Sequence, residues 1–336
     1  MTTRESVLLS SLTTFKIGGP ARYVIDCESE SDVREAVAFA AAQQLPFTVL
    51  GGGSNVLAPD EGYAGVIIRP LLTRVSFDEH DDGVQVIAEA GVPWDALVHE
   101  ACARDLWGLE NLAGIPGSVG AAPIQNIGAY GAEAAETILW VEVLDPATGE
   151  VTRIANADCA FGYRDSRFKR NPGAIILRVA FLLQKNGAPR IGYADLARAQ
   201  EAGVPLAAPE QIAAAVRAIR AKKFPDLSKE GTAGSFFKNP HISADAYAAL
   251  KVRYPDLPGF PNATSVKVPL AWILDRVLNL RGFTQGNARL FEAQPLVIAA
   301  AFGATNKEVQ SLAAYVSDRV KEVTNIQLEW EVRQLA

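Results

Sequence analysis

Hydrophobic residues in the first part of the chain follow the period of helices in some segments and the period of strands in others. Val33, Ala36, Val37 and Ala40 form one stripe of a helix, and Ser31 is the residue expected to cap its N-terminus. Apolar runs and turn residues give the further expected segments: strands at 47–50, 65–69 and 84–91, a helix at 93–105 and a hairpin at 139–155. Strands that alternate with helices indicate an α/β arrangement for this region.

The residue composition of the chain changes after a helix predicted at 209–223. Pro225 follows this helix, and proline in that place stops a helix and marks a candidate domain boundary. The region beyond has glycine- and proline-rich turns, a helix at 269–277 and a long amphipathic helix whose stripe begins at Val309. The last segment, 326–335, alternates apolar and charged residues as a half-buried strand does. We expect an α/β region, a smaller α+β region and a final strand that returns to the first.

A first glycine-rich segment follows the strand predicted at 47–50. Its candidate ligand contacts are Gly51, Gly52, Gly53, Ser54 and Asn55. Glycine permits close approach of the backbone, so consecutive N–H groups can converge on an anion. The spacing matches neither a Rossmann fingerprint nor a P-loop, and an ordinary tight turn explains a glycine triplet about equally well.

A second segment, 114–131, has glycine at every third position from 114 to 120 and carries almost no charge. Small residues of this kind suggest backbone lying against a flat or extended ligand, and two such loops suit a dinucleotide held outside a Rossmann fold. A buried packing segment of glycine and alanine is the alternative. The candidate contacts are Gly114, Ile115, Pro116, Gly117, Ser118, Gly120, Gln125, Asn126 and Gly128.

The amino-acid composition argues against several classes of protein function. The 32 Lys and Arg against 38 Asp and Glu give a net charge of −6, which argues against a nucleic-acid binder. Three distant cysteines without a CxxC pair and three scattered histidines predict no metal site and no disulfide framework, and favour a reducing compartment. The apolar runs are too short for a membrane span or a signal peptide. We therefore expect a soluble, cytoplasmic protein. A monomer is the expected oligomeric state, although composition does not determine it.

Six motifs occur in a fixed order along the chain, and the middle ones are long. They cover 14–21, 49–55, 114–131, 163–169, 234–240 and 328–333. The ordered set resembles the UDP-N-acetylenolpyruvoylglucosamine reductase (MurB) family, bacterial flavoenzymes of cell-wall synthesis, over nearly the whole chain. The resemblance implies an α+β protein with the two-lobed FAD-binding fold of the vanillyl-alcohol-oxidase/PCMH type and a smaller α+β substrate domain.

The same resemblance implies domain boundaries. They are an FAD-binding lobe at 1–70, a second lobe at 71–224, a substrate-binding domain at 225–324 and a C-terminal strand at 325–336 that returns to the second lobe.

The reaction implied by the resemblance reduces the enolpyruvyl ether of UDP-N-acetylglucosamine enolpyruvate to the lactyl ether of UDP-N-acetylmuramate. NADPH reduces non-covalently bound FAD, and hydride then passes to the vinyl carbon. The resemblance assigns Ser235 as proton donor, with Arg164 and Glu331 stabilising an enolate-like intermediate. A guanidinium can hold a carboxylate with two bonds, whereas a glutamate beside another carboxylate helps only when protonated. Strand alternation places Glu329 and Glu331 on one face, so periodicity does not choose between them.

Further residues match positions that contact substrate in the family. They are Tyr163, Tyr193, Lys223, Asn239 and Lys267. Tyr193 corresponds to the tyrosine that closes over substrate in one of the two family classes, although a lone loop aromatic more often serves packing. The chain departs from the family pattern at Trp330, where proline is usual, and at Phe260, where many members carry tyrosine.

Two other functions are compatible with parts of this pattern. One is another FAD-dependent oxidoreductase of the same fold that acts on sugars or alcohols, since a fold hosts many activities. The other is a flavin- or nucleotide-binding sensor without turnover. The motifs at 234–240 and 328–333 favour the reductase over the first, and intact Arg164, Ser235 and Glu331 favour an enzyme over the second.

Overall fold

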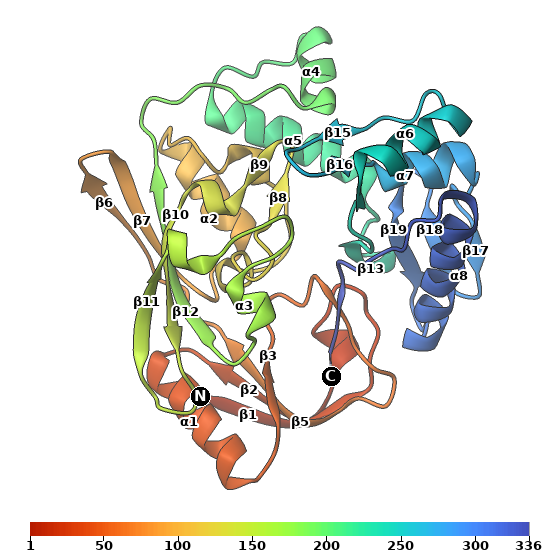
Figure 1. Cartoon of the computed structure of the whole chain (residues 1–336). Helices are drawn as coiled ribbons and strands as arrows, with labels where there is room; N and C mark the ends of the chain where they lie inside the picture. The colour runs from red at the N-terminus through yellow and green to blue at the C-terminus, as the bar shows by residue number, and fades with distance from the viewer. Residues whose placement is uncertain (336) are drawn as a thin grey trace. The chain divides into compact units, whose positions relative to one another are not determined.

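The structure is a computed structural model that describes residues 1–335, and it divides into two compact units (Figure 1). Unit 1 consists of Met1–Val7, Ala21–Gly52 and Ala64–Ala221, whereas unit 2 consists of Leu8–Pro20, Gly53–Tyr63 and the described chain from Lys222 onward. The division into two lobes and a substrate domain stays a prediction. Residue 336, the last of the expected C-terminal strand, lies outside the described residues.

The first sheet of unit 1 has four strands in the order β1-β2-β5-β3. Their bounds are β1 (Thr2–Leu8), β2 (Pro20–Cys27), β5 (Tyr63–Pro70) and β3 (Phe47–Val49). Strands β3 and β5 are parallel. Val66, Ile67 and Ile68 are all buried, so both faces of β5 are covered, which explains why this strand is an unbroken apolar run in the sequence.

Helix α1 (Glu30–Ala42) packs against this sheet through the predicted stripe, but Ser31 does not cap it. The cap is Ser29, whose hydroxyl accepts the Asp32 amide N–H at 3.1 Å while the Asp32 carboxylate accepts the Ser29 N–H at 3.2 Å. This reciprocal pair satisfies two donors that the helix start leaves open, which Ser31, bonded to Glu35, does not do.

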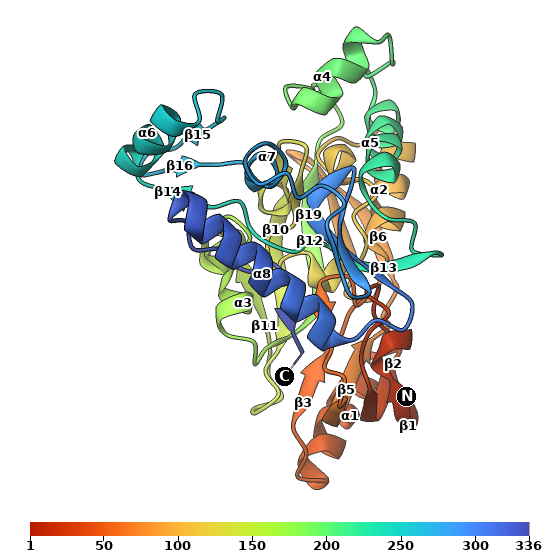
Figure 2. The ribbon, with the colours of Figure 1, turned by 90° about the vertical axis from the view of Figure 1, so that its right-hand side faces the viewer.

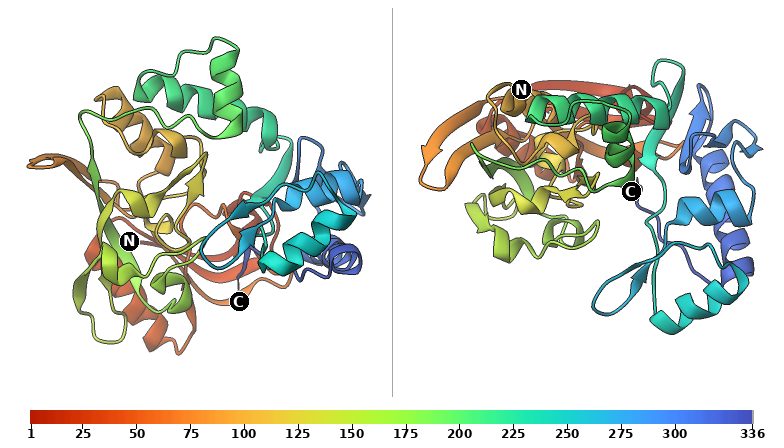
Figure 3. Two further views of the ribbon diagram at one scale, coloured as in Figure 1. Left: turned by 45° about the horizontal axis from the view of Figure 1, so that its top comes forward. Right: turned by 90° about the horizontal axis from the view of Figure 1, so that it is seen from above.

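The second sheet of unit 1 is antiparallel, in the order β11-β10-β12-β7-β6. Its strands are β11 (Val151–Ala155), β10 (Ile138–Leu144), β12 (Ile175–Leu183), β7 (Gly83–Glu89) and β6 (Val75–His80). The β6–β7 hairpin projects from the rest of unit 1 (Figure 3). The predicted strands at 65–69 and 84–91 and the hairpin at 139–155 are confirmed.

Helices and a small hairpin complete unit 1. They are α2 (Trp94–Ala103), the hairpin β8 (Gly128–Ala129) with β9 (Ala132–Glu133), α3 (Arg167–Arg170), α4 (Ala194–Glu201) and α5 (Pro209–Lys223). Trp94 and Phe181 meet edge to face in the core beneath α2, with ring centroids 5.9 Å apart. The helix predicted at 209–223 is confirmed as α5.

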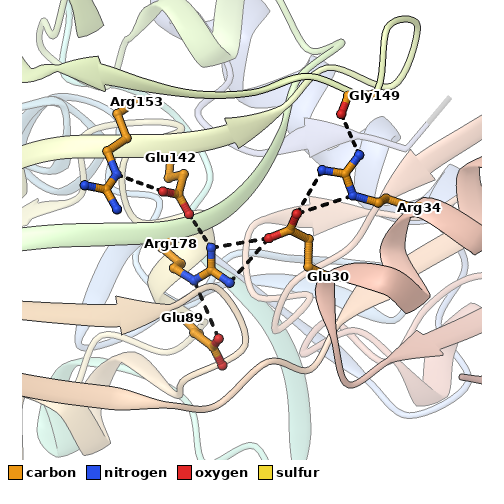
Figure 4. A network of polar contacts seen from close by, with 7 residues as sticks. All are labelled: Glu30, Arg34, Glu89, Glu142, Gly149, Arg153 and Arg178. Carbon is orange, nitrogen blue, oxygen red and sulfur yellow. Dashed lines mark hydrogen bonds and ion pairs between the residues drawn. The ribbon is translucent and has the colours of Figure 1, made fainter.

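A polar network joins α1 to four strands of the second sheet (Figure 4). At its centre, the Arg178 guanidinium on β12 donates to the Glu142 carboxylate on β10. The same guanidinium lies 3.6 Å from a Glu89 oxygen on β7 and 3.4 Å from a Glu30 oxygen on α1. Arg153 donates to the other oxygen of Glu142 at 2.8 Å. One cation thus ties helix α1 to three strands of the second sheet.

Replacing Arg178 with methionine is expected to lower the free energy of unfolding by about 3 kcal/mol. The reason is that the substitution leaves the Glu142 carboxylate, whose side chain is 7% exposed, with only one of its two cationic partners, the largely exposed Arg153. Urea unfolding of the wild type and the variant measures this. Arg104→Met is the control, because it removes an exposed ion pair with Glu100 and a contact of the guanidinium with the Phe77 ring. An equal loss of stability in this variant would contradict the assignment.

The same network predicts how stability depends on pH. Burial alone would raise the pKa of Glu142, but hydrogen bonds from Arg153 and Arg178 outweigh it and hold the pKa below its ordinary 4.5. The contribution of Glu142 is therefore complete above pH 4.5 and is lost as the pH falls through the lower folded-state pKa. As the pH falls from 5 to the lowest pH at which both proteins still fold, the free energy of unfolding should decrease more for the wild type than for Arg178→Met. Equal decreases in the two proteins would contradict this.

Unit 2 is built on an antiparallel sheet in the order β13-β19-β18-β17. These strands are β13 (Glu230–Ser235), β19 (Gln294–Ala301), β18 (Ala288–Phe291) and β17 (Thr284–Gln285). Helix α8 (Asn306–Thr324) contacts β17 and β18 and buries the predicted stripe that begins at Val309 (Figure 2). Its cap is Thr305 in a reciprocal pair with Glu308.

Smaller elements complete unit 2. They are β14 (His241–Ile242), α6 (Ala244–Arg253), β15 (Phe260–Pro261), β16 (Val266–Lys267) and α7 (Leu270–Trp272). The helix predicted at 269–277 begins as α7 and continues as a wider π-type turn at Ile273–Val277. Within residues 1–335, no helix combines the length and the apolar character that crossing a bilayer requires.

The C-terminal segment differs from the strand expected at 326–335. Only β20 (Arg333–Gln334) forms a ladder, and it pairs in parallel with β4 (Val56–Leu57) of unit 2 instead of with residues 71–224. The apolar alternation has another cause: Ile326 and Val332 are buried in the core of unit 2 from an extended segment. Burial on one face produces the same pattern whether or not the backbone pairs.

Candidate functional site

The two predicted glycine segments of unit 1 lie against each other. A Cβ atom on Gly52 would stand 2.8 Å from the Cα of Gly117, and one on Gly51 would stand 2.6 Å from the hydroxyl of Ser118. Only glycine allows backbones to approach this closely. The sequence therefore needs small residues on both segments, which it has.

Four backbone donors of these two segments have no acceptor within residues 1–335. The amide N–H groups of Gly51, Gly52, Gly117 and Ser118 donate no hydrogen bond within residues 1–335. Unpaired amides that converge from two glycine loops provide hydrogen-bond donors for an anion such as a diphosphate. Gly53, which follows with a φ of +63°, begins the next segment of unit 2 together with Ser54 and Asn55.

The second glycine segment is held in place at both ends. Gly120 donates its N–H to the Ala90 carbonyl at 2.9 Å, and Gly114 donates to the Asp95 carboxylate at 2.6 Å. Arg220 of α5 donates to the Gly114 carbonyl at 2.9 Å, and burial lowers the pKa of this guanidinium below its ordinary range. Ile115 packs on the core of unit 1, Pro116 is exposed, and Gln125 is half-buried.

Asn126 was predicted to contact a ligand, and the structure uses its side chain within the protein. The amide nitrogen donates to Glu133 at 2.7 Å and to the Gly162 carbonyl at 3.1 Å, while the amide oxygen accepts from Ala135 at 2.9 Å. Asn126 is buried. It therefore positions the turn at Gly162 against the β8–β9 hairpin.

Arg164 stands in that turn. Gly162 and Asp165 exchange backbone hydrogen bonds across it, and Arg164 has a φ of +53°, which is uncommon for a residue with a side chain. Its guanidinium donates to the carbonyl of Gly128 and lies 5.3 Å from the ring centroid of Tyr163. One predicted catalytic residue, one predicted substrate residue and one predicted cofactor residue of unit 1 thus come together.

Ser235 ends strand β13 of unit 2 at an irregularity in the ladder. The register with β19 shifts between Thr232 and Ser235, and Gly234 takes a φ of +80° at this point. Ser235 is half-buried, and its hydroxyl has no hydrogen-bond partner within residues 1–335. An irregularity of this kind at a strand end changes the direction of a side chain from the one that regular alternation would give it.

The predicted motifs around Ser235 and Glu331 pair with each other in unit 2. Glu331 and Val332 donate their amides to the Phe236 carbonyl, at 2.8 and 3.5 Å, and Trp330 meets the Phe236 ring edge to face. The carbonyl of Phe236, the residue after Ser235, is therefore bonded directly to the backbone of Glu331. Asn55, from the first glycine segment, donates its side-chain amide to the Glu331 carbonyl at 3.2 Å.

Glu329 and Glu331 have different environments in the structure, although strand periodicity places them on the same face. Glu329 is exposed and its carboxylate pairs with Lys238, with 2.5 Å between Oε2 and Nζ. Glu331 is half-buried. The N-terminal motif supports the same strand, because Thr14 donates its hydroxyl to the Thr232 carbonyl at 2.6 Å and accepts the Thr232 N–H at 3.1 Å.

The remaining predicted substrate residues belong to different units. Tyr193 of unit 1 is 46% exposed and stands directly before α4. Lys223, Asn239 and Lys267 belong to unit 2; the Asn239 side chain accepts the Leu270 N–H at 3.0 Å. The Lys267 ammonium lies 5.8 Å from the ring centroid of Phe260.

Comparison with known proteins matches this arrangement over the full chain. The profile described as an FAD binding domain matches residues 21–155, and the one described as the C-terminal domain of UDP-N-acetylenolpyruvoylglucosamine reductase matches residues 226–335. A reductase of that name from Pseudomonas putida is 38% identical over 331 residues, which cover 98% of this chain and 97% of the relative. The chain belongs to the UDP-N-acetylenolpyruvoylglucosamine reductase family.

Other members of the reductase family show a similar relation. A reductase from Salmonella typhi is 40% identical over 97% of this chain and 94% of the relative. The crystal structure of the family member from Thermus caldophilus superposes with a TM-score of 0.70, at 27% identity and complete coverage of both chains. The predicted family, the FAD-binding fold and the activity class of an FAD-dependent oxidoreductase are confirmed.

The residues of unit 1 fit FAD. The reductase family implies this cofactor, and the glycine contact of 2.8 Å together with four unpaired amides gives the close, donor-rich backbone that a dinucleotide diphosphate needs. Three residues that support this backbone were missed in the sequence: Ala90, Asp95 and Arg220. Their only signal was their proximity in space, since an alanine in a strand and charges on helices are ordinary in sequence.

Proposed function

We propose that this chain reduces UDP-N-acetylglucosamine enolpyruvate to UDP-N-acetylmuramate with NADPH, a step in the synthesis of peptidoglycan precursors in the cytoplasm. The observation that carries the proposal is the pairing of two motifs, by which the carbonyl of Phe236, the residue after Ser235, accepts the Glu331 amide at 2.8 Å. This pairing brings the backbones of the Ser235 and Glu331 motifs together in unit 2, and both motifs are those on which the resemblance rests.

Bound FAD supplies the exchange of hydride between NADPH and the vinyl carbon of the substrate. Candidate residues to hold it are Gly51, Gly52, Gly53, Ser54, Asn55, Gly114, Ile115, Pro116, Gly117, Ser118, Gly120, Gln125, Asn126 and Gly128. The unpaired amides bind the diphosphate, while Asn126 acts by positioning.

The side chains supply charge and a proton. Addition of hydride to the vinyl carbon leaves negative charge next to the substrate carboxylate, which the Arg164 guanidinium stabilises more in the transition state than in the ground state. Glu331 contributes when protonated. Ser235 gives its hydroxyl proton to the carbon next to the carboxylate, which completes the net addition of two hydrogen atoms to the double bond.

Binding of the substrate uses a separate set of residues. Lys223 and Lys267 offer point charges for the diphosphate, Asn239 offers an amide, and Tyr163 and Tyr193 offer aromatic faces. An acidic protein can bind such anions because local charge, not the net charge of −6, determines the field at a site. We propose that the chain acts as a monomer.

Steady-state turnover tests the proposed function. Oxidation of NADPH should depend on UDP-N-acetylglucosamine enolpyruvate, and mass spectrometry should find a product heavier by two hydrogens. In deuterated water, one deuterium should enter at the carbon beside the carboxylate. If oxidation of NADPH proceeds equally without the enolpyruvyl sugar and no such product forms, this substrate is wrong.

A further inference from the structure

The segment that carries Tyr193 contacts another part of unit 1 at several positions. We name residues 184–193 the Tyr193 strap; it runs from the end of β12 to the start of α4 (Figure 1). Gln184 and Trp107 exchange backbone hydrogen bonds of 3.0 and 2.8 Å. A Cβ atom on Gly187 would stand 2.4 Å from the Trp107 ring, so the strap lies flat on the indole.

A buried asparagine holds the strap further along. The Asn111 side-chain nitrogen donates to the Arg190 carbonyl of the strap at 2.8 Å and to the Tyr130 carbonyl at 2.9 Å. Its oxygen is buried without a partner within residues 1–335. An unpaired buried acceptor is costly, so the two donated bonds are what an asparagine at this position contributes.

Tyr130 has an unusual conformation for its residue type. It forms the two-residue loop of the β8–β9 hairpin with Gly131, and their φ angles are +49° and +84°. A loop with positive φ at both positions favours asparagine, aspartate or glycine, and a bulky side chain is strained there. The Tyr130 ring is buried and meets the ring of Tyr193 edge to face, with centroids 5.3 Å apart.

We propose that Asn111 and Tyr130 are positioning residues that fix Tyr193 for contact with the UDP-sugar substrate. Asn111 bonds the carbonyl of the strap and the carbonyl of the strained hairpin residue with one amide group, which sets the distance between the two backbones. The strained conformation points the Tyr130 ring at Tyr193. This inference rests on the proposed function, in which Tyr193 covers the bound substrate.

The test uses the FAD-loaded enzyme with NADPH and UDP-N-acetylglucosamine enolpyruvate. Asn111→Ala should raise KM for the enolpyruvyl sugar about tenfold, as expected for the loss of two hydrogen bonds, while NADPH bleaches the flavin band at an unchanged rate. Tyr130→Leu keeps apolar volume in the core and removes the ring, and should raise the same KM about threefold or more. Tyr130→Phe retains the ring and should restore the wild-type value.

A double-mutant cycle separates positioning from general destabilisation. In a Tyr193→Ala background, Asn111→Ala should add almost nothing to KM, because both changes then remove the same contact. Effects that multiply in the double variant would overturn the inference while wild-type turnover upholds the proposed function. If Asn111→Ala does not fold, the same cycle with Tyr130→Leu decides. If the wild type does not turn over the enolpyruvyl sugar, the proposed function and this inference both fail.

Discussion

Ser235→Ala is expected to lower the rate at which the enolpyruvyl substrate is reduced by about a hundredfold or more, while the flavin band still bleaches with NADPH at the wild-type rate. A positioned general acid contributes a factor of about 10²–10⁴, and the Ser235 hydroxyl is the proton source that we assign. Removal of one oxygen at the end of β13 leaves the ladder with β19 intact, since the bonds there are made by the backbone.

Separate observation of the two half-reactions provides the measurement. Stopped-flow absorbance follows the bleaching by NADPH and, in a second mixing step, the return of the band with the enolpyruvyl sugar. Ser317→Ala is the matched control, because Ser317 is a half-buried serine of the same unit whose hydroxyl bonds a carbonyl within α8. Equal rates of return in Ser235→Ala and Ser317→Ala would remove Ser235 from the role of proton donor.

Gly52→Ala is expected to weaken FAD binding about tenfold or more. The added Cβ would stand 2.8 Å from the Cα and 3.2 Å from the carbonyl carbon of Gly117, so one of the two glycine segments must move. Overpacking of this kind costs roughly 1–3 kcal/mol, and 1.4 kcal/mol corresponds to a factor of ten in the dissociation constant. The unpaired amides would then no longer converge on the same anion.

Fluorescence titration of the apoprotein with FAD measures this dissociation constant. Gly173→Ala is the control, because a Cβ atom there meets no atom within 4 Å and the glycine belongs to the same unit. The two variants should differ by about the full tenfold factor. Tight binding by Gly52→Ala, with the flavin content of the wild type, would show that the contact between the two glycine segments does not form the cofactor site.

The motifs could be identified from sequence because glycine has few substitutes where backbones touch. The glycine-rich runs at 51–53 and 114–120 indicate that the backbone lies close to another group, although the sequence does not identify that group. The sequence likewise predicted α5 and α8. The apolar face of each helix is buried in a single hydrophobic core. These features are local, and local features survive in a linear sequence.

Other features depend on contacts between distant segments and could not be predicted. The segment at 326–335 shows the alternation of a strand, yet its apolar residues are buried from an extended chain in which only the two residues of β20 form a strand. Ser29, not Ser31, caps α1. Ser29 accepts the Asp32 N–H, and the Asp32 carboxylate in turn accepts the Ser29 N–H. Asn111 carries no signal in the sequence, since its two acceptors lie 19 and 79 residues away.

One anaerobic titration tests the central claim most directly. The purified FAD-loaded protein is bleached with one equivalent of NADPH, and UDP-N-acetylglucosamine enolpyruvate is then added without oxygen while the visible flavin band is recorded. The account predicts that the band returns in proportion to the enolpyruvyl sugar added, and that UDP-N-acetylmuramate forms in equal amount. A band that bleaches and stays bleached would contradict the proposed reaction and would leave a flavoprotein with a different electron acceptor.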